Sequence, residues 1–477
     1  MKKTYIDTAM ERIAPDLILK GGNVVDVFSG KVIKADVIIK DGIICGVGSY
    51  SGENEQDVSG KYIMPGFIDS HVHIESSMTQ PSEYAKAVMP HGITTVIADP
   101  HEITNVCGED GLEFMLKSAK NIPLDVNLML PSCVPATPFE HTGANLDAKT
   151  TQKLAPKFFG IGEMMNYPGI VSGDDETLGK LCLDIVDGHA PLLSGHELDA
   201  YASAGIKTDH ECSVIEEMTE KISKGMYILL REGTLSLDVA KLIKGVTPYT
   251  LRRCAFCTDD RFVGEIIRDG SIDHCIRKAV SLGLSNIDAI IMATLNACEM
   301  YGMKNKGAIA PSYVADIVVA DDLNLSSISQ VYKNGKLVCE NGKALFECET
   351  VDNSKVTNTV HLPKISADFF KTDVKDKFDA IELIPESIIT KKVTVSYSDS
   401  LSKVCVIERH HNLGTKGIGF VTNYGITNGA IATSIGHDSH NVIVIGDNDS
   451  DMALAVNTLG TSGGIAVCSE GKVIASM

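Results

Sequence analysis

Short runs of apolar residues recur through the middle of the chain, and a polar, helix-like stretch follows each run. This alternation of strand-like and helix-like segments predicts parallel βαβ units. Eight repeats within roughly 250 residues match the size of a (β/α)8 barrel, in which the active site lies at the carboxyl ends of the strands. We place the predicted strands at Phe67–Ser70, Ile93–Ala98, Val126–Leu130, Phe158–Gly162, Leu183–Val186, Gly205–Lys207, Tyr227–Leu230 and Cys254–Cys257.

The two flanks of this region follow a different pattern, in which apolar and polar residues alternate and Gly or Asp turns separate the runs. Leu17–Gly22 and Val37–Gly42 lie before the barrel, and Ala315–Ala320 and Val331–Lys336 lie after it. Alternation with tight turns is typical of antiparallel strands. The simplest interpretation is one β-sandwich built from both flanks of an inserted barrel.

The last part of the chain changes character again after a polar connection, with strand-like runs, a Gly-rich block and one helix-like segment. We interpret it as an α+β domain. The predicted fold class is therefore α/β, with three parts: a composite β-sandwich over 1–63 and 312–350, a (β/α)8 barrel over 64–311, and a C-terminal α+β domain over 378–477.

Composition and charge exclude several classes of function but say little about the fold. The 477 residues carry a formal net charge of -19, which argues against nucleic acid or an anionic membrane as a partner. The N-terminal segment has no apolar core of a signal peptide, and no apolar run is long enough to span a bilayer. We therefore expect a cytoplasmic enzyme with a small substrate, and base rates favour a homo-oligomer, most simply a homodimer.

Metal-ligand side chains follow the predicted strands. His71 and His73 are two residues apart at the end of the first strand, so both imidazoles point the same way. Imidazole and carboxylate together suit Zn, Mn or Fe(II). The set is too large for one tetrahedral ion and indicates two ions bridged by a carboxylate and a hydroxide. The predicted ligands are His71, His73, Glu163, His189, His210 and Asp259.

Each of these residues taken alone is also compatible with an ordinary hydrogen-bonded polar side chain, so the prediction depends on their joint occurrence at one end of the barrel. Asp260 is the alternative to Asp259, and we prefer Asp259 because the first residue past such a strand usually points inward. Asp99–Glu102, Pro131–Cys133 and Arg231–Gly233 follow other strands and would face the same mouth. They are candidates for substrate contact or for loop capping.

These motifs resemble a known family. The flanks and the segment Pro65–His73 are similar to the amidohydrolase superfamily, and further segments resemble bacterial adenine deaminases within it. In the barrel, the similar segments are His73–Met78, Asp99–Ile103, Gly162–Met165, Asp187–Pro191 and Asp209–Glu211; near the C-terminus they are Glu408–His410, Gly429–Ala432, His437–Asn441 and Asp449–Ala453.

The resemblance implies hydrolytic deamination of adenine to hypoxanthine and ammonia in purine salvage, with a binuclear centre of Mn(2+) or Fe(2+), or of Zn(2+). It also implies that Glu163 holds the bridging place that a carbamylated lysine holds in many relatives. Members of this family usually continue well beyond the equivalent of Gly471–Ala475, whereas this sequence stops at Met477. The resemblance therefore implies a shortened last domain.

A mechanism follows as a hypothesis. A metal-bound hydroxide attacks C6 of adenine, and Asp259 takes its proton and passes it to the leaving amino group. Glu211 is the candidate that protonates a ring nitrogen. The candidates for holding the purine are Glu75, His101, Arg231 and Glu232.

Two other functions use the same residues differently. A cyclic amide hydrolase of dihydroorotase or hydantoinase type needs the same ligand set, although the segments around His73, His101 and Met164 argue against it. A non-catalytic relative would be expected to lose metal ligands, and the set is intact here. The His-x-Glu and Pro-Cys-x-x-Cys signature of zinc nucleobase deaminases is absent from the sequence.

Overall fold

The computed structural model describes residues 2–373, 376–384, 390–398 and 401–477. By internal contacts the chain divides into two compact units, which we describe separately. The first unit comprises Met1–Pro100, Met115–Ser132 and Ala148–Thr350, and the second comprises His101–Phe114, Cys133–Asp147 and Val351–Met477. The expected domain limits place residues 64–311 in one barrel, so the two inner segments of the second unit are a feature that the sequence pattern did not indicate.

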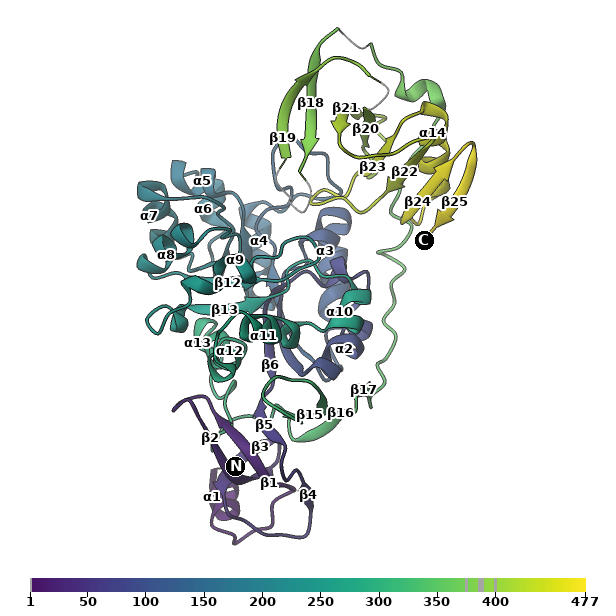
Figure 1. Ribbon diagram of the computed structural model, residues 1–477. Coiled ribbons are helices and arrows are strands. Elements are labelled where there is room, and N and C mark those ends of the chain that lie inside the picture. Colours follow the sequence, from purple (N-terminus) through teal and green to yellow (C-terminus); the bar gives the residue numbers. More distant parts are fainter. Residues whose placement is uncertain (1, 374–375, 385–389, 399–400) are drawn as a thin grey trace. The chain divides into compact units, whose positions relative to one another are not determined.

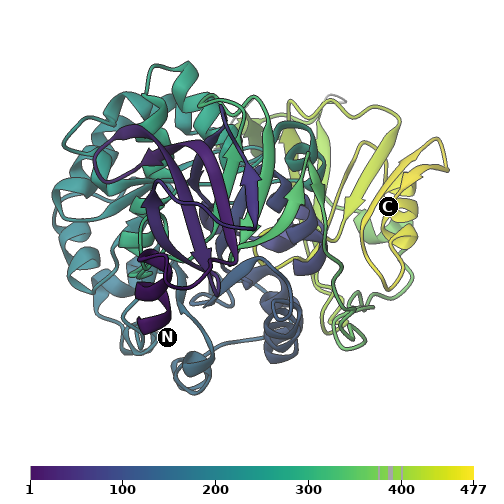
Figure 2. The same cartoon turned by 90° about the horizontal axis from the view of Figure 1, so that it is seen from below.

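Strands from both flanks of the first unit pair within one sheet (Figures 1 and 2). Its described residues form nine strands in the order β17-β16-β15-β14-β5-β1-β2-β3, with β4 beside β1. The junction between the flanks is the antiparallel pair β5–β14, in which Ile317 lies opposite Pro65. The sequence predicts a sandwich from these strands, and the pairing gives a single composite sheet. The bounds are β1 Leu17–Asp26, β2 Lys31–Lys40, β3 Ile43–Gly48, β4 Glu55–Asp57, β5 Tyr62–Pro65, β14 Ile317–Ala320, β15 Ile328–Lys333, β16 Lys336–Glu340 and β17 Lys343–Ala344.

Between these two flanks, the first unit contains parallel strands, β6 to β13, in a curled arrangement. The described strands pair as β10-β9-β8-β7-β6 and as β11-β12-β13. The two groups meet at the carboxyl ends of β6 and β13, where Asp259 N donates to His71 O at 3.0 Å. The bounds are β6 Phe67–Val72, β7 Ile93–Ala98, β8 Asp125–Leu130, β9 Gly160–Met164, β10 Val186–Gly188, β11 Thr208–Asp209, β12 Tyr227–Arg231 and β13 Cys254–Cys257.

Helices connect these strands, and several begin at residues suited to cap them. Asp174 accepts a hydrogen bond from Thr177 N at 2.8 Å and Ser285 accepts one from Asp288 N at 3.1 Å, which satisfies amides at the helix starts. The α-helices are α1 Lys2–Ala9, α2 Pro81–Val88, α3 His101–Ser118, α4 Ala148–Leu154, α5 Tyr167–Ser172, α6 Asp175–Gly179, α7 Gly195–Ser203, α8 Ile215–Ser223, α9 Val239–Leu242, α10 Val263–Asp269, α11 Ile272–Ser281, α12 Asn286–Met292 and α13 Leu295–Met300. Short 3-10 turns are η1 Ile74–Ser77, η2 Met89–His91, η3 Ala155–Lys157, η4 Ile243–Gly245 and η5 Leu251–Arg253.

The second unit is built on an antiparallel-rich sheet covered by one helix. Its described strands run in the order β19-β18-β21-β20-β23-β22-β24-β25. Along β24, buried and partly buried residues alternate, as expected for a half-buried strand. The bounds are η6 Ala367–Phe370, β18 Phe378–Leu383, β19 Thr390–Val395, β20 Ser402–Ile407, β21 Lys416–Thr422, β22 Gly429–Thr433, β23 Val442–Gly446, α14 Asp449–Thr458, β24 Ile465–Ser469 and β25 Lys472–Ser476.

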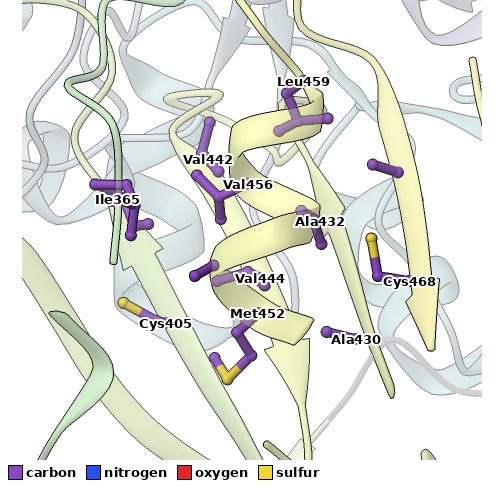
Figure 3. Packing of buried hydrophobic residues seen from close by; sticks show 14 of the residues in the cluster. Ile365, Cys405, Ala430, Ala432, Val442, Val444, Met452, Val456, Leu459 and Cys468 are labelled. Carbon is purple, nitrogen blue, oxygen red and sulfur yellow. The ribbon is translucent and has the colours of Figure 1, made fainter. Parts of the chain in front are cut away.

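The core of the second unit lies between α14 and this sheet (Figure 3). Met452, Val456 and Leu459 occupy one face of the helix and are buried. They pack with Val444 of β23 and Cys468 of β24 in one apolar cluster. The helix starts at Asn448, whose side chain accepts from Asp451 N at 2.8 Å. The expected α+β character of this part of the chain therefore has a physical basis in one amphipathic helix on one sheet face.

No helix within the described ranges combines the length and the apolar character that crossing a bilayer would require.

Candidate metal centre

The residues predicted as metal ligands lie at the carboxyl ends of the parallel strands and are brought together in one cluster. His71 is on β6 and Glu163 is on β9, while the other imidazoles and Asp259 follow strands directly or within two residues. The cluster is buried except at His189, whose side chain keeps a quarter of its exposure. The side chains that the structure brings together are His71, His73, Glu163, His189, His210 and Asp259.

Glu163 divides the cluster into two halves. Its Oε1 lies 3.4 Å from His73 Nε2, and His71 Nε2 lies 3.1 Å from that same nitrogen. Its Oε2 lies 2.6 Å from His189 Nδ1 and 3.1 Å from His210 Nε2. Each carboxylate oxygen thus faces a separate pair of imidazoles, which is the arrangement that a carboxylate bridging two ions needs.

Asp259, and not its neighbour, belongs to the cluster. Asp259 Oδ1 lies 3.2 Å from His73 Nε2 and 3.6 Å from His71 Nε2. Asp260 Oδ1 instead accepts a hydrogen bond from Ser76 Oγ at 2.5 Å. The preference for Asp259 over Asp260 as the inward residue therefore agrees with where the two side chains lie.

Hydrogen bonds behind the cluster orient its imidazoles. His73 Nδ1 lies 2.8 Å from the carbonyl oxygen of Asp99, so this nitrogen carries the proton and donates it. In the neutral ring, Nε2 then keeps a lone pair aimed at the cluster. Asp99 also fixes the strand that carries the bridge, because its Oδ2 accepts from Glu163 N at 2.9 Å. Such backing is what metal-ligating histidines and carboxylates typically have.

Behind His71 lies a second carboxylate. His71 Nδ1 is 3.6 Å from Asp187 Oδ2, and Asp187 Oδ1 in turn accepts from Thr208 Oγ1 at 3.0 Å and from the Tyr301 hydroxyl at 2.9 Å. Neither Asp187 nor Tyr301 is among the site residues predicted from the sequence. Asp187 carries a weak signal, since it lies two residues before His189, whereas the position of Tyr301 depends on tertiary packing alone.

A buried lysine supports the half of the cluster that contains His189 and His210. Lys221 Nζ donates to Asp209 Oδ2 at 3.0 Å and to Ala190 O at 2.7 Å. Asp209 also accepts from Ala190 N at 3.0 Å. These bonds join the residues that follow β10 to the end of β11. They hold β10 and β11 in place, because such short strands form few backbone hydrogen bonds.

Arg231, predicted to contact substrate, is bound to three carboxylates. Its Nη1 donates to Asp259 Oδ2 at 2.9 Å and also to Glu211, and its Nε donates to Asp238 Oδ2 at 3.1 Å. The guanidinium therefore joins the candidate base, Asp259, to the candidate proton donor, Glu211. Glu211 Oε1 is 3.7 Å from His210 Nε2, so it borders the cluster.

The remaining predicted substrate residues have other neighbours. Glu232 is buried and pairs with Lys278. Glu75 is half-buried within η1. His101 begins α3, belongs to the second unit and lies 3.7 Å from Asp438. Their expected contact with a purine stays a prediction.

The electrostatics of the cluster favour ionised carboxylates. Burial alone would raise the pKa of Asp259, but a hydrogen bond with His73 and the charges of His210 and Arg231 hold it well below its usual range. Burial alone would lower the pKa of His210, but Glu163 and Asp259 outweigh it and raise that pKa to about 9. Without metal, protons on the imidazoles balance the carboxylates, and a cation would replace those protons.

Comparisons with known proteins agree with this fold. Residues 62–338 match the model of the amidohydrolase family, and residues 383–477 match that of the adenine deaminase C-terminal domain. Among solved structures, the β-aspartyl dipeptidase of Fervidobacterium islandicum AW-1 is 20% identical with a TM-score of 0.51, covering 70% of this chain and 99% of that one. An enamidase is 18% identical with a TM-score of 0.52, covering 69% and 97%. The chain has the amidohydrolase fold, with a curled parallel sheet and a C-terminal β domain.

Curated relatives identify the branch of the amidohydrolase family to which the chain is similar. Adenine deaminase of Clostridium acetobutylicum is 47% identical over 493 residues, which cover 99% of this chain and 86% of that protein. Adenine deaminase 2 of Desulfotalea psychrophila is 44% identical over 496 residues, covering 100% and 86%. The chain belongs to the adenine deaminase family of amidohydrolases. The resemblance inferred from the sequence motifs is confirmed.

Proposed function

We propose that this chain hydrolyses adenine to hypoxanthine and ammonia. The observation that carries the proposal is the identity of 41–47% over nearly the whole chain to curated relatives named adenine deaminase. The second support is the cluster itself, because every ligand type that the reaction needs lies at the carboxyl ends of the parallel strands. We infer that these strands close into a (β/α)8 barrel around it.

The residues fit a pair of divalent ions. His71, His73 and Asp259 would hold one ion, His189 and His210 the other, and Glu163 would bridge them through its two oxygens. The lone pair that His73 Nε2 directs into the cluster supports this assignment. Ions bound here would make a water molecule nucleophilic near neutral pH. Imidazole and carboxylate ligands suit Mn(2+) or Fe(2+), and Zn(2+) is also compatible with them.

Asp259 acts as the base. It is ionised at neutral pH, because its pKa is held well below its usual range against the effect of burial. It takes a proton from the attacking water and delivers it to the amino nitrogen that leaves C6 as ammonia. Protonation matters because ammonia leaves far more readily than amide ion. Arg231 keeps Oδ2 in place at 2.9 Å, so Oδ1 stays turned toward the imidazoles.

Glu211 acts as the proton donor to the purine ring. Its Oε1 borders His210 and His189, at 3.7 Å and 4.0 Å, and it is held by Arg231. Proton donation to a ring nitrogen draws electrons from C6 and makes that carbon a better electrophile. Arg231 serves as the positioning residue for both carboxylates. Glu75, His101 and Glu232 remain candidates for holding the purine edge.

Two expectations from the sequence belong to this proposal as well. We propose that the protein works as a homodimer in the cytoplasm, with adenine and water as its substrates.

The test measures ammonia and hypoxanthine released from adenine by protein whose metal has been stripped and then restored with Mn(2+), Fe(2+) or Zn(2+). We expect turnover to vanish on chelation and to return once about two ions per chain occupy this cluster. If two ions bind and no ammonia appears, adenine is the wrong substrate. Ring opening of a cyclic amide under those conditions would favour the dihydroorotase-type alternative.

A further inference from the structure

A second group of histidines and carboxylates lies within the second unit. Glu102 comes from the first turn of α3, while His437 and His440 come from the segment between β22 and β23. His101 and Asp438 adjoin them and share His437 with the first three. None of the proposed steps of adenine hydrolysis uses Glu102 or the three residues between β22 and β23.

The spacing of these groups matches ligands around a common ion better than hydrogen-bonded pairs. His437 Nδ1 is 3.8 Å from Glu102 Oε1, His440 Nε2 is 3.7 Å from Glu102 Oε2, and His101 Nε2 is 3.7 Å from Asp438 Oδ1. Direct hydrogen bonds of this kind are shorter, at about 2.7–3.2 Å. Two ligand atoms each about 2.1 Å from one ion are separated by about 3.4 Å at a tetrahedral angle, and by more at wider angles.

The burial of His440 supports a bound ion at this spacing. His440 is 5% exposed, and its Nε2 has no hydrogen-bond partner among the residues that the structure describes. A buried polar nitrogen without a partner normally costs free energy, so it calls for an explanation. The other ring nitrogen, Nδ1, accepts a hydrogen bond from Gly436 N at 3.4 Å, which is longer than most such bonds. A cation between His440 and Glu102 would give this nitrogen a partner.

The group also has an access route. The His437 side chain keeps 39% of its exposure and lines a cavity of about 470 Å³ in the same unit. An ion could therefore reach the buried Glu102 and His440 from the solvent side. A route of entry is one of the features expected of a working metal site.

We propose that Glu102, His437 and His440 bind one divalent first-row transition-metal ion. Mixed imidazole and carboxylate ligands select such ions over Mg(2+) and Ca(2+). Because these ligands come from two separate segments of the second unit, we infer that the ion has a structural role. The ion ties the start of α3 to the segment before β23, and thereby stabilises the second unit.

The test counts metal per folded chain in the full-length protein after loading with Zn(2+) or Co(2+) and removal of unbound ion. His437→Ala is the main variant, because a half-exposed side chain can be removed without opening a cavity in the core. Glu102→Gln keeps the size of the side chain and is the second variant. His361→Ala, which removes an exposed histidine of the same unit, is the matched control.

We expect His437→Ala and Glu102→Gln each to bind one equivalent less than the unchanged protein, and His361→Ala to bind the same amount. Added ion should raise the unfolding temperature of the unchanged protein and of His361→Ala. The rise should be several degrees larger than in His437→Ala and Glu102→Gln. Equal metal content in all four proteins would overturn the proposal. An anomalous diffraction peak between His437 and His440 would locate the ion.

A barrel variant separates this inference from the proposed deaminase function. Glu163→Ala should lose the barrel ions and retain the ion of the second unit, which Co(2+) absorption can report without any substrate. Loss of all metal in Glu163→Ala would contradict the second site, whereas a failure to release ammonia from adenine would leave the count of ions in this site unaffected.

Discussion

The two clusters of histidines and carboxylates in this molecule differ in how their ligands are held. In the first unit, the ligands come from the ends of five buried strands, and the closest pair is 2.6 Å apart. In the second unit, the ligands come from a helix start and one loop, and the corresponding ion-pair distances are 3.7–3.8 Å. The barrel cluster has hydrogen bonds behind it, such as that of His73 with Asp99 O at 2.8 Å.

This difference teaches what kind of scaffold suits which task. Rigid strand ends can crowd carboxylates and imidazoles closely, because the surrounding structure compensates for the repulsion and the desolvation. A crowded and oriented cluster suits catalysis, where ligand geometry must persist through the reaction. A looser group between a helix and a loop suits an ion that stabilises the fold. The following predictions test this contrast, beginning with the largest expected effect.

Removing the bridge should have the largest effect. Glu163→Ala deletes the carboxylate that faces both imidazole pairs, at 3.4 Å and 2.6 Å. We expect turnover of adenine to fall by about 10³-fold or more, together with loss of the barrel ions. Ammonia release and metal content measure the two effects. Glu197→Gln, a change at an exposed position of α7, is the control and should behave like the unchanged protein.

Removing the proposed base should reduce turnover by less. Asp259→Asn keeps the shape of the side chain and loses the proton acceptor, so we expect kcat to fall by about 10²–10⁴-fold while adenine still binds. Asp260→Asn is the matched control, because Asp260 is bonded to Ser76 and lies outside the cluster. If the Asp260 variant lost more activity than the Asp259 variant with metal intact, the assignment of the base would be wrong.

The strand ends explain how much the sequence could predict. Buried parallel strands are short apolar runs with a recognisable start and end, and the first three predicted strands agree closely with β6, β7 and β8. The fifth and sixth were placed about three residues too early. Their strands, β10 and β11, have only 3 and 2 residues, so their boundaries depend on side-chain bonds such as those of Lys221 rather than on periodicity.

Residues behind the cluster were harder to predict for a similar reason. A ligand at a strand end is marked by its place in the sequence pattern, but Tyr301 contacts Asp187 across 114 positions of the chain. Nothing local at Tyr301 reports that contact. The same holds for the two segments His101–Phe114 and Cys133–Asp147, which join the second unit through tertiary contacts. One of these contacts is the bond from Asn441 Nδ2 to His141 O, at 2.8 Å.

A smaller effect is expected from the arginine that joins the two catalytic carboxylates. Arg231→Lys keeps the charge but cannot bind Asp259, Glu211 and Asp238 at once, because an ammonium lacks the fork of donors. We expect kcat to fall about tenfold with little change in KM, and the free energy of unfolding to fall by about 3 kcal/mol. Steady-state kinetics and chemical unfolding measure these. Arg268→Lys, at an exposed pair with Asp269, should change neither.

The last prediction concerns the stability of the metal-free protein rather than turnover. The pKa of His210 is raised from 6.5 to about 9 by Glu163 and Asp259, against the effect of burial. A raised pKa in the folded state adds stability that is fully present below pH 6.5 and is lost as the pH rises through about 9; here it amounts to about 3 kcal/mol. The metal-free protein should therefore unfold several degrees lower at pH 9 than at pH 6.5.

Metal should abolish this pH dependence, because bound cations replace the protons on the imidazoles and are not released by a rise to pH 9. Thermal unfolding at both pH values, with and without Mn(2+), measures the contrast. His210→Gln removes the titrating ring, so its metal-free form should lose less stability over the same interval. If both proteins lost the same stability between pH 6.5 and pH 9, the proton on His210 would not be what balances the charges of Glu163 and Asp259. The contrast between the two clusters would then depend on their distances alone.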